Sequence, residues 1–454
     1  MQHVRDKVYA LLLLLLCLLP VVLLGLVVTG TVAIHPGFVL VAFLLCFVAM
    51  YWAVRMIFQS SPSEIIEKTR ETMASPHAAP HIDVDEAVRR ADGLLAPTAS
   101  YRSGEQLVIE GELHRAPDEA YEELQRRFAG TELVPLLQET EDGRPALVLA
   151  PKSKLPEPAQ TSQRTWVNAA LLLATLATTT WAGALHEGVN LLEEPGRMMA
   201  GFPYALALML ILGAHELGHY FTARRYGIDV SLPYFIPVPF ALGTFGAFIK
   251  MKSLSPTRRA AFDVAVAGPL AGLVIAIPAL LVGLQYSEVV ATGQAPPTMM
   301  GGADVGSSLL FALLAKLALG DAVLEGHRLV LHPVAFAGWL GLLVTALNLM
   351  PVGQLDGGHM AHALLGRQRA YSAGVATLVA LAVLGLFVWG GLLFWALIIY
   401  FIAGTRDAPP LNDVSRLDRG RVVLGALAFA LLLAILLPVP PSLYAPFGIH
   451  SPYL

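Results

Sequence analysis

Long uninterrupted runs of apolar residues dominate the pattern along the chain. Two come first, at Val8–Ile34 and Phe38–Val54, separated by His35-Pro36-Gly37. Because a membrane-spanning helix needs about 20 mainly apolar residues, these runs predict a helical hairpin in a membrane. A cleavable signal peptide is the alternative for the first run, since basic residues precede it, but the run is longer than the apolar stretch of a typical signal.

Further apolar runs follow a long polar stretch. They lie at Thr165–Leu185, Phe202–Ala223, Ala260–Leu284, Pro333–Met350, Ser372–Ala403 and Val422–Leu437. The run at Ser372–Ala403 is too long for one span, and the sequence Trp389-Gly390-Gly391 at its centre predicts a second hairpin. The pattern therefore predicts a polytopic α-helical membrane protein with about nine spans, and residues 307–319 could add a half-length helix.

The polar stretch at residues 59–164 has a different pattern. A Pro/Ala-rich linker at 75–80 precedes a strand-like segment at Gln106–Leu113, a helical one at Ala116–Phe128 and two more strand-like segments at Leu133–Leu137 and Ala146–Ala150. This pattern predicts a small α+β domain of βαββ order. We therefore expect four parts: a transmembrane hairpin (1–58), the linker and α+β domain (59–164), a catalytic core (165–366) and C-terminal transmembrane helices (367–454).

Composition agrees with a membrane protein. Of 454 residues, 56% are hydrophobic and only 14% are charged, whereas soluble domains average about 25% charged residues. The net charge of −4 provides no basic surface for nucleic acid. The only cysteines, Cys17 and Cys46, both lie in apolar runs, which excludes a disulfide framework and a Cys-based zinc site. A metal would have to be held by histidines and carboxylates.

Arginine and lysine gather in alternate loops. The segments 224–259, 367–369 and 406–421 are basic, whereas the loops at 186–200 and 285–306 carry a single Arg between them. Because basic loops stay on the cytoplasmic side of a membrane, the α+β domain and the basic loops are expected to face the cytoplasm.

One motif within an apolar run carries chemistry. His215-Glu216-Leu217-Gly218-His219 places two histidines four positions apart, on one face of a helix, where both imidazoles reach one zinc ion while Glu216 flanks an open coordination position. A chance match is the alternative. A Glu within a membrane span is costly unless it has a partner, however, so a functional role is favoured.

A catalytic zinc site usually has a third protein ligand. Asp356 is the only charged residue between Arg328 and Arg367, and the predicted topology brings it to the same membrane side as His219. Gly357 and Gly358 also allow the backbone to turn there. Asp356 is therefore the expected third ligand.

Other candidate ligands are weaker. Asp263 also lies near the start of a span, but Arg258 and Arg259 are close in sequence, so we expect them to be its ion-pair partners. His359 and His362 follow Asp356 and are expected at the membrane interface.

This arrangement suits metal-assisted hydrolysis of a peptide bond, with Glu216 as general base. Asn348 is expected either to hydrogen-bond the substrate or to join two helices. The segment Leu232–Ile249 is apolar but broken by prolines and glycines, so it is expected to be extended. Its Gly243, Phe245 and Gly246 are candidate substrate-binding residues at a strand edge, and a simple connector is the alternative.

Three segments together resemble the site-2 protease family of intramembrane zinc metalloproteases. They are His215-Glu216-x-x-His219, Ala267–Gly272, and Asn348-x-x-Pro351 followed by Asp356-Gly357-Gly358, in family order. The Gly243–Ala247 run and the inserted domain look most like the plastid and bacterial branch. The resemblance implies zinc bound by His215, His219 and Asp356, Glu216 as general base, and cleavage of membrane-spanning protein substrates in the lipid bilayer.

Two other functions were weighed. A catalytically silent zinc-binding scaffold or chaperone has no need of Glu216, and a metal transporter needs polar residues spread along several spans. The prediction is a zinc metalloendopeptidase in a bacterial inner membrane, with its site near the cytoplasmic side.

Overall fold

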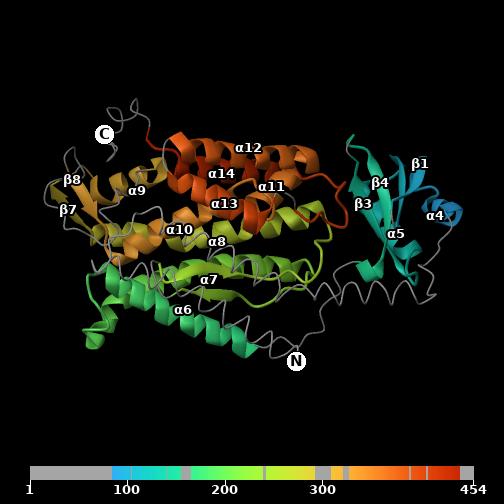
Figure 1. Ribbon diagram of the computed structural model, residues 1–454. Coiled ribbons are helices and arrows are strands. Elements are labelled where there is room, and N and C mark those ends of the chain that lie inside the picture. The colour runs from blue at the N-terminus through green and yellow to red at the C-terminus, as the bar shows by residue number, and fades with distance from the viewer. Residues whose placement is uncertain are drawn as a thin grey trace. The chain divides into compact units, whose positions relative to one another are not determined.

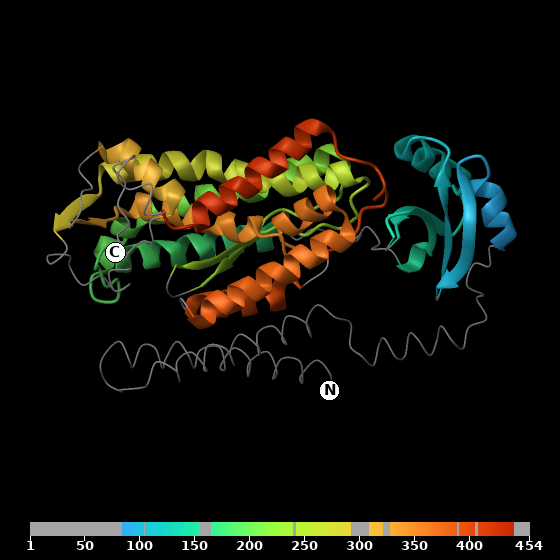
Figure 2. The ribbon, with the colours of Figure 1, turned by 90° about the horizontal axis from the view of Figure 1, so that it is seen from above.

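The computed structural model describes residues 84–103, 105–140, 142–154, 165–238, 242–291, 308–320, 327–387, 390–404 and 407–439. All of them fall within one compact unit, Ile82–Leu454. The predicted N-terminal hairpin and the linker at 75–80 lie outside the described residues. Figures 1 and 2 show the described elements from two directions.

Within the described residues, five helices are long and apolar enough to cross a membrane. They are α6 (Thr165–His186), α7 (Phe202–Arg225), α8 (Arg258–Gln285), α12 (Arg367–Phe387) and α14 (Arg419–Leu436). A 3-10 turn, η2 (Pro195–Gly201), leads directly into α7. The mostly helical membrane fold is confirmed, whereas the total of about nine spans stays a prediction.

Shorter apolar helices complete the bundle. α10 (Pro333–Leu349) has 17 residues and α13 (Gly390–Ala403) has 14. α10 ends because Met350 precedes Pro351 and takes an extended conformation, as residues before proline do. α12 and α13 pack against each other, as expected for the second hairpin. α9 (Leu309–Leu319) is the half-length helix, and α11 (Asp356–Leu365) begins at the aspartate.

Small residues let the central helices approach closely. α7 packs against α8, and α10 contacts both (Figure 1). A Cβ added to Gly218 of α7 would lie 2.5 Å from the carbonyl oxygen of Ala267 in α8, and one added to Gly338 of α10 would lie 2.6 Å from the nitrogen of Leu280. Close backbone contact of this kind is typical of helices that associate in lipid, where apolar side chains gain nothing by leaving water.

The α+β domain (residues 84–154) is built differently. Its elements are α4 (Val84–Ala91), β1 (Leu95–Ser103), β2 (Gln106–Leu113), α5 (Pro117–Arg127), β3 (Leu133–Glu139) and β4 (Pro145–Pro151), followed by a 3-10 turn, η1 (Lys152–Lys154). The strands form an antiparallel sheet in the order β1-β2-β4-β3. The predicted βαββ order was therefore incomplete, because α4 and β1 precede it. β1 is an edge strand with most side chains exposed, so it lacks the apolar alternation of its neighbours.

Two short antiparallel strand pairs lie between the helices, a hairpin and a pair whose strands are separated by α9. β5 (Tyr234–Pro237) pairs with β6 (Thr244–Phe248), and β7 (Glu288–Ala291) pairs with β8 (His327–Val330). The first is the extended segment expected between α7 and α8. The Thr178 hydroxyl donates to the Gly243 carbonyl at 2.7 Å and the Tyr204 hydroxyl donates to the Leu242 carbonyl at 2.9 Å, so α6 and α7 hold its turn in place.

Candidate metal centre

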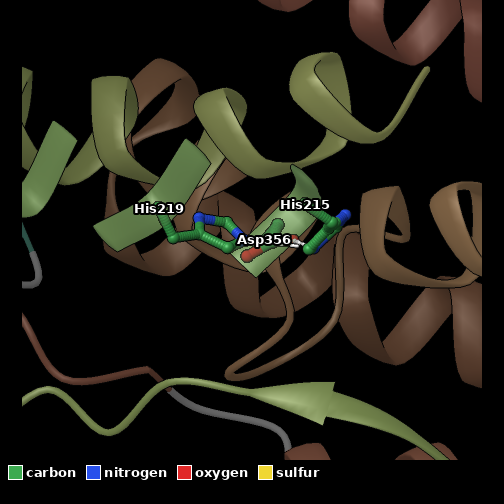
Figure 3. A group of neighbouring side chains, drawn as sticks. All are labelled: His215, His219 and Asp356. Atoms are coloured by element: carbon green, nitrogen blue, oxygen red, sulfur yellow. Dashed lines mark hydrogen bonds and ion pairs between the residues drawn. The ribbon is translucent and has the colours of Figure 1, made fainter. Parts of the chain in front are cut away.

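Two helices bring three metal-binding side chains together. His215 and His219 lie on one face of α7, and Asp356 is the first residue of α11, with its carboxylate between the two imidazoles (Figure 3). Asp356 Oδ2 lies 3.4 Å from His215 Nε2 and 3.3 Å from His219 Nε2, and the two nitrogens are 3.1 Å apart. Within the described residues this is the one group of three or more His, Cys, Asp or Glu side chains with the spacing of a metal site.

The three distances fit zinc. Zinc takes imidazole nitrogens and carboxylate oxygens at about 2.0–2.2 Å in a tetrahedral arrangement, so neighbouring ligand atoms stand roughly 3.3–3.5 Å apart. The three observed separations lie at or just below this range. Within the described residues the cluster offers three ligand atoms, the number that catalytic rather than structural zinc sites usually take from the protein.

The imidazole of His219 is oriented from α8. Its Nδ1 lies 2.7 Å from the carbonyl oxygen of Val264, which fixes Nδ1 as the donor and leaves Nε2 as the lone-pair nitrogen that faces Asp356. Gly268 lies directly against the ring, where any Cβ would overlap it, and Gly272 lies beside His215. The Ala267–Gly272 segment therefore makes the space that the two imidazoles occupy.

A cavity of about 570 Å³ opens beside this cluster. His215, Glu216 and His219 of α7 line one side, and Asn348 and Asp356 line another. Glu216 is itself buried, with 6% of its surface exposed. The cavity therefore gives the open zinc position access to a carboxylate and to a space large enough for a substrate segment.

Asn348 lies next to the cluster. Its Nδ2 is 3.2 Å from Nε2 of His215. This contact joins α10 to α7, as in the second of the two expected roles, and the hydrogen bond to substrate stays a prediction.

The structure does not bring the three tentative substrate residues into the cavity. Gly243 is packed against α6, Phe245 is exposed, and Gly246 has φ +103°. The cavity wall is instead formed by the segment that follows them, 247–255. The expected extended segment Leu232–Ile249 includes the first part of this wall, 247–249. Residues 250–255 were not predicted, because Lys250 and Lys252 make them resemble an ordinary basic loop.

Asp263 lies away from the cluster, as expected, but its partners differ from those predicted. Arg421 of α14 donates to both of its oxygens, at 2.7 and 2.6 Å, and the Tyr226 hydroxyl donates at 2.5 Å. Arg258 and Arg259 instead pair with other acidic residues. Arg421 is far away in sequence, so local spacing could not identify it.

His362 is also placed differently from the prediction. It is 2% exposed rather than interfacial, and its two ring nitrogens contact Asp407 and Asp413. His359 lines the cavity.

Comparison with known proteins agrees with this geometry. Residues 203–389, which contain the whole cluster, match the model described as peptidase family M50. This segment is thus similar to peptidase family M50. The predicted resemblance to the site-2 proteases is thereby confirmed, and the predicted class of zinc metalloprotease agrees with it.

The M50 segment also has curated relatives in plants. The chain is 31% identical over 342 residues to "Probable zinc metalloprotease EGY2, chloroplastic" of Arabidopsis thaliana, covering 74% of this chain and 60% of that protein. It is 38% identical over 256 residues to "Probable zinc metalloprotease EGY1, chloroplastic" of the same plant, covering 55% and 45%.

The chain thus spans at most about three fifths of these relatives. No solved structure matches it. The predicted zinc cofactor is confirmed by the relatives and by the cluster of two histidines and one aspartate.

Proposed function

We propose that this protein is an intramembrane zinc metalloprotease that hydrolyses peptide bonds in membrane-spanning protein substrates. His215, His219 and Asp356 would hold the zinc, and Glu216 would be the general base. The observation that carries the proposal is the near-tetrahedral spacing of the three ligand atoms, with Glu216 on the wall of the same cavity. The similarity of the M50 segment to a peptidase family supports it.

Two polar residues of the cavity wall, Glu216 and Asn348, have a step in this reaction. When bound, zinc polarises the scissile carbonyl and lowers the pKa of a water molecule toward about 7. Glu216 accepts the proton of the attacking water and later delivers it to the leaving amine. Asn348 Nδ2, which lies beside His215, donates a hydrogen bond to the oxyanion of the tetrahedral intermediate.

The cavity wall offers a strand edge for the substrate. Ser231 donates its N–H to the Lys250 carbonyl at 3.0 Å, and Lys252 donates to the Asp229 carbonyl at 2.7 Å. Since alternate residues of a strand direct their backbone groups to opposite edges, Ile249 and Met251 direct theirs away from 229–231. Both residues line the cavity. The backbone N–H of Ile249 donates a hydrogen bond to the Glu216 carboxylate, so an unwound substrate segment would pair with Met251 and pass the zinc position beside Glu216.

A membrane location follows from the five long apolar helices. We propose that this membrane is the plasma membrane of a bacterium. The distribution of Arg and Lys supports an orientation with the site toward the cytoplasm. The relatives are named as chloroplastic proteins, so a plastid membrane is the alternative, and fractionation of the source cells distinguishes the two.

Glu216→Gln tests the function. The variant should bind zinc as the wild type does, because no ligand changes, and should cleave a model membrane-spanning substrate about 10²–10⁴-fold more slowly, as expected for loss of a general base. Glu193→Gln, in the exposed loop after α6, is the matched control and should cleave normally. Wild-type cleavage by Glu216→Gln would overturn the role of Glu216 as general base, whereas no cleavage by the wild-type chain would favour the catalytically silent scaffold. Loss of its zinc would show that Glu216 is a ligand.

A further inference from the structure

The backbone that carries Asp356 is held by the connection between α13 and α14. We call residues 403–404 and 407–415 of this connection the strap. Gln354, two residues before Asp356, donates its N–H to the Ala403 carbonyl at 3.0 Å. Gly353 has φ +49° and lies so close to the strap carbonyls of Ala403 and Gly404 that no side chain fits there. The turn that introduces Asp356 is therefore shaped by the strap.

The strap also holds the helix that follows. His362 of α11 places Nδ1 2.6 Å from Asp407 Oδ2 and Nε2 3.0 Å from Asp413 Oδ2. Burial opposes a charge on His362, but the hydrogen bonds of the two carboxylates outweigh it and raise its pKa to about 9. The imidazole is therefore cationic at neutral pH, and an ion triad joins α11 to the strap at two points.

On its other side the strap pairs with the α+β domain. Leu137 of β3 donates its N–H to the Leu411 carbonyl at 2.9 Å, and Asp413 donates to the Leu137 carbonyl at 2.7 Å. Leu411 in turn donates to Ser255, in the cavity wall, at 2.9 Å. The strap thus lies as a short strand between the edge of the domain sheet and the segment that leads into α8.

Ion pairs also join the α+β domain, the strap and the start of α8. Arg258, at the start of α8, places Nε 3.0 Å from Asp413 Oδ1 and a terminal nitrogen 2.9 Å from Glu139 Oε2. Glu139 is the last residue of β3, and its carboxylate also lies against Gly366 at the end of α11. Asp413 and Arg258 are 1% and 8% exposed, and separating buried partners leaves an uncompensated charge. The domain, the strap and α11 are therefore expected to move together.

We propose that the strap positions the Asp356 carboxylate, so that docking of the α+β domain on the strap sets the affinity of the site for zinc. Asp407, Asp413 and His362 are positioning residues in this arrangement, and Glu139 is the domain's contribution. The proposal rests on the proposed function in one respect, namely that Asp356 is a zinc ligand. It makes the α+β domain part of the metal site's support rather than an independent module.

The test compares zinc dissociation constants of the purified full-length chain, measured by competition with a chromogenic chelator. Asp407→Asn removes the carboxylate that holds His362 and should weaken zinc binding about 10–100-fold, the usual effect of losing a group that orients a ligand. Asp263→Asn is the matched control, a carboxylate held by an arginine outside the strap, and should bind zinc within twofold of the wild type. Asp407→Glu restores the charge and should recover most of the affinity.

A second pair of variants tests the domain side. Glu139→Gln should weaken zinc binding about 3–10-fold, an intermediate effect because Glu139 acts through Arg258 and the strap. Glu123→Gln is its control, since this carboxylate of α5 is similarly exposed but pairs only within the domain. If Asp407→Asn fails to fold, Glu139→Gln tests whether the strap sets the zinc affinity, because the Glu139 side chain is partly exposed at the edge of the junction.

Cobalt substitution adds a readout that stability alone does not change. The visible absorption of bound Co²⁺ reports ligand geometry, and Asp407→Asn should shift this spectrum whereas Asp263→Asn should not. Wild-type zinc affinity and cobalt spectrum in both Asp407→Asn and Glu139→Gln would overturn the proposal. Asp356→Asn separates the proposed zinc ligands from the proposed role of the strap. If this variant retains zinc, the proposed set of zinc ligands is wrong. If it loses zinc while Asp407→Asn and Glu139→Gln bind as the wild type does, only the proposed role of the strap is wrong.

Discussion

The interiors of the helical core and of the α+β domain are packed in different ways. In the core, α7, α8 and α10 meet through glycines that bring backbones together, and the polar side chains converge in buried clusters such as His215, His219 and Asp356. In the domain, large apolar side chains fill the space under the sheet, and ion pairs such as Glu123–Arg127 lie at the surface. Backbone proximity thus shapes the chemistry of the core, whereas side-chain volume stabilises the domain.

The largest effect that sharpens this comparison is expected at Gly268. A Cβ there would overlap the His219 imidazole and rotate it away from Asp356, so Gly268→Ala should weaken zinc binding by at least about 100-fold, the upper end of effects on ligand orientation. Gly272→Ala is the matched control, because its Cβ would meet His215 Cβ and Nδ1 at 3.4 Å, an ordinary contact. Isothermal titration with zinc measures both. Equal affinities for the two variants would show that backbone proximity does not determine the site.

The sequence predicts the core and its metal cluster well because each signal is local. Spacing places His215 and His219 on one helix face, and Asp356 stands alone in an apolar region. The structure brings these three side chains together, and their role as zinc ligands stays a prediction. Most helix boundaries agree within a few residues for the same reason, because apolar runs mark them directly.

What the sequence did not predict depends on distant pairings or weak patterns. β1 has mostly exposed side chains and contains Pro97, so no alternation marks it as a strand. The strap was missed because His362 meets Asp407 and Asp413 across 45 and 51 positions, and Leu137 meets residue 411 across the whole catalytic core. No local motif encodes such contacts.

An effect on stability rather than on zinc binding is expected when the core of the domain is changed. Leu124 of α5 is fully buried, so Leu124→Ala should destabilise the domain by about 2–5 kcal/mol, the usual loss for a buried leucine. The Leu124 side chain lies in the core cluster against which Leu411 and Val414 of the strap pack, but it takes no part in the hydrogen bonds and ion pairs that join the domain to the strap. Zinc affinity should therefore stay unchanged as long as the domain remains folded. Glu122→Ala, on the exposed face of the same helix, is the control and should change stability by less than about 0.5 kcal/mol. Urea unfolding followed by far-UV circular dichroism measures the change in stability, and zinc titration measures the affinity.

The last effect concerns the junction between the two regions and depends on pH. The folded pKa of His362 is raised to about 9 from an ordinary value near 6.5, so its contribution to stability is fully present below about pH 6.5 and is lost as the pH rises through about 9. The groups that face it are Asp407 and Asp413, with His359 also beside Asp407 and Arg258 beside Asp413. The Asp407 pKa is depressed by hydrogen bonds from the two histidines, although burial opposes this, so its own contribution disappears only as the pH falls below about 4.

The junction should therefore be most stable between about pH 4 and 6.5 and lose on the order of 3 kcal/mol by pH 9, the upper limit set by the shift of the His362 pKa. Thermal unfolding of the wild type and of His362→Gln across this range measures the difference. The two curves should converge as the pH rises, because the variant has no imidazolium to lose. A gap that stays constant from pH 6 to pH 9 would show that His362 acts by packing rather than by charge, and that the helical core and the domain are joined by strand pairing alone.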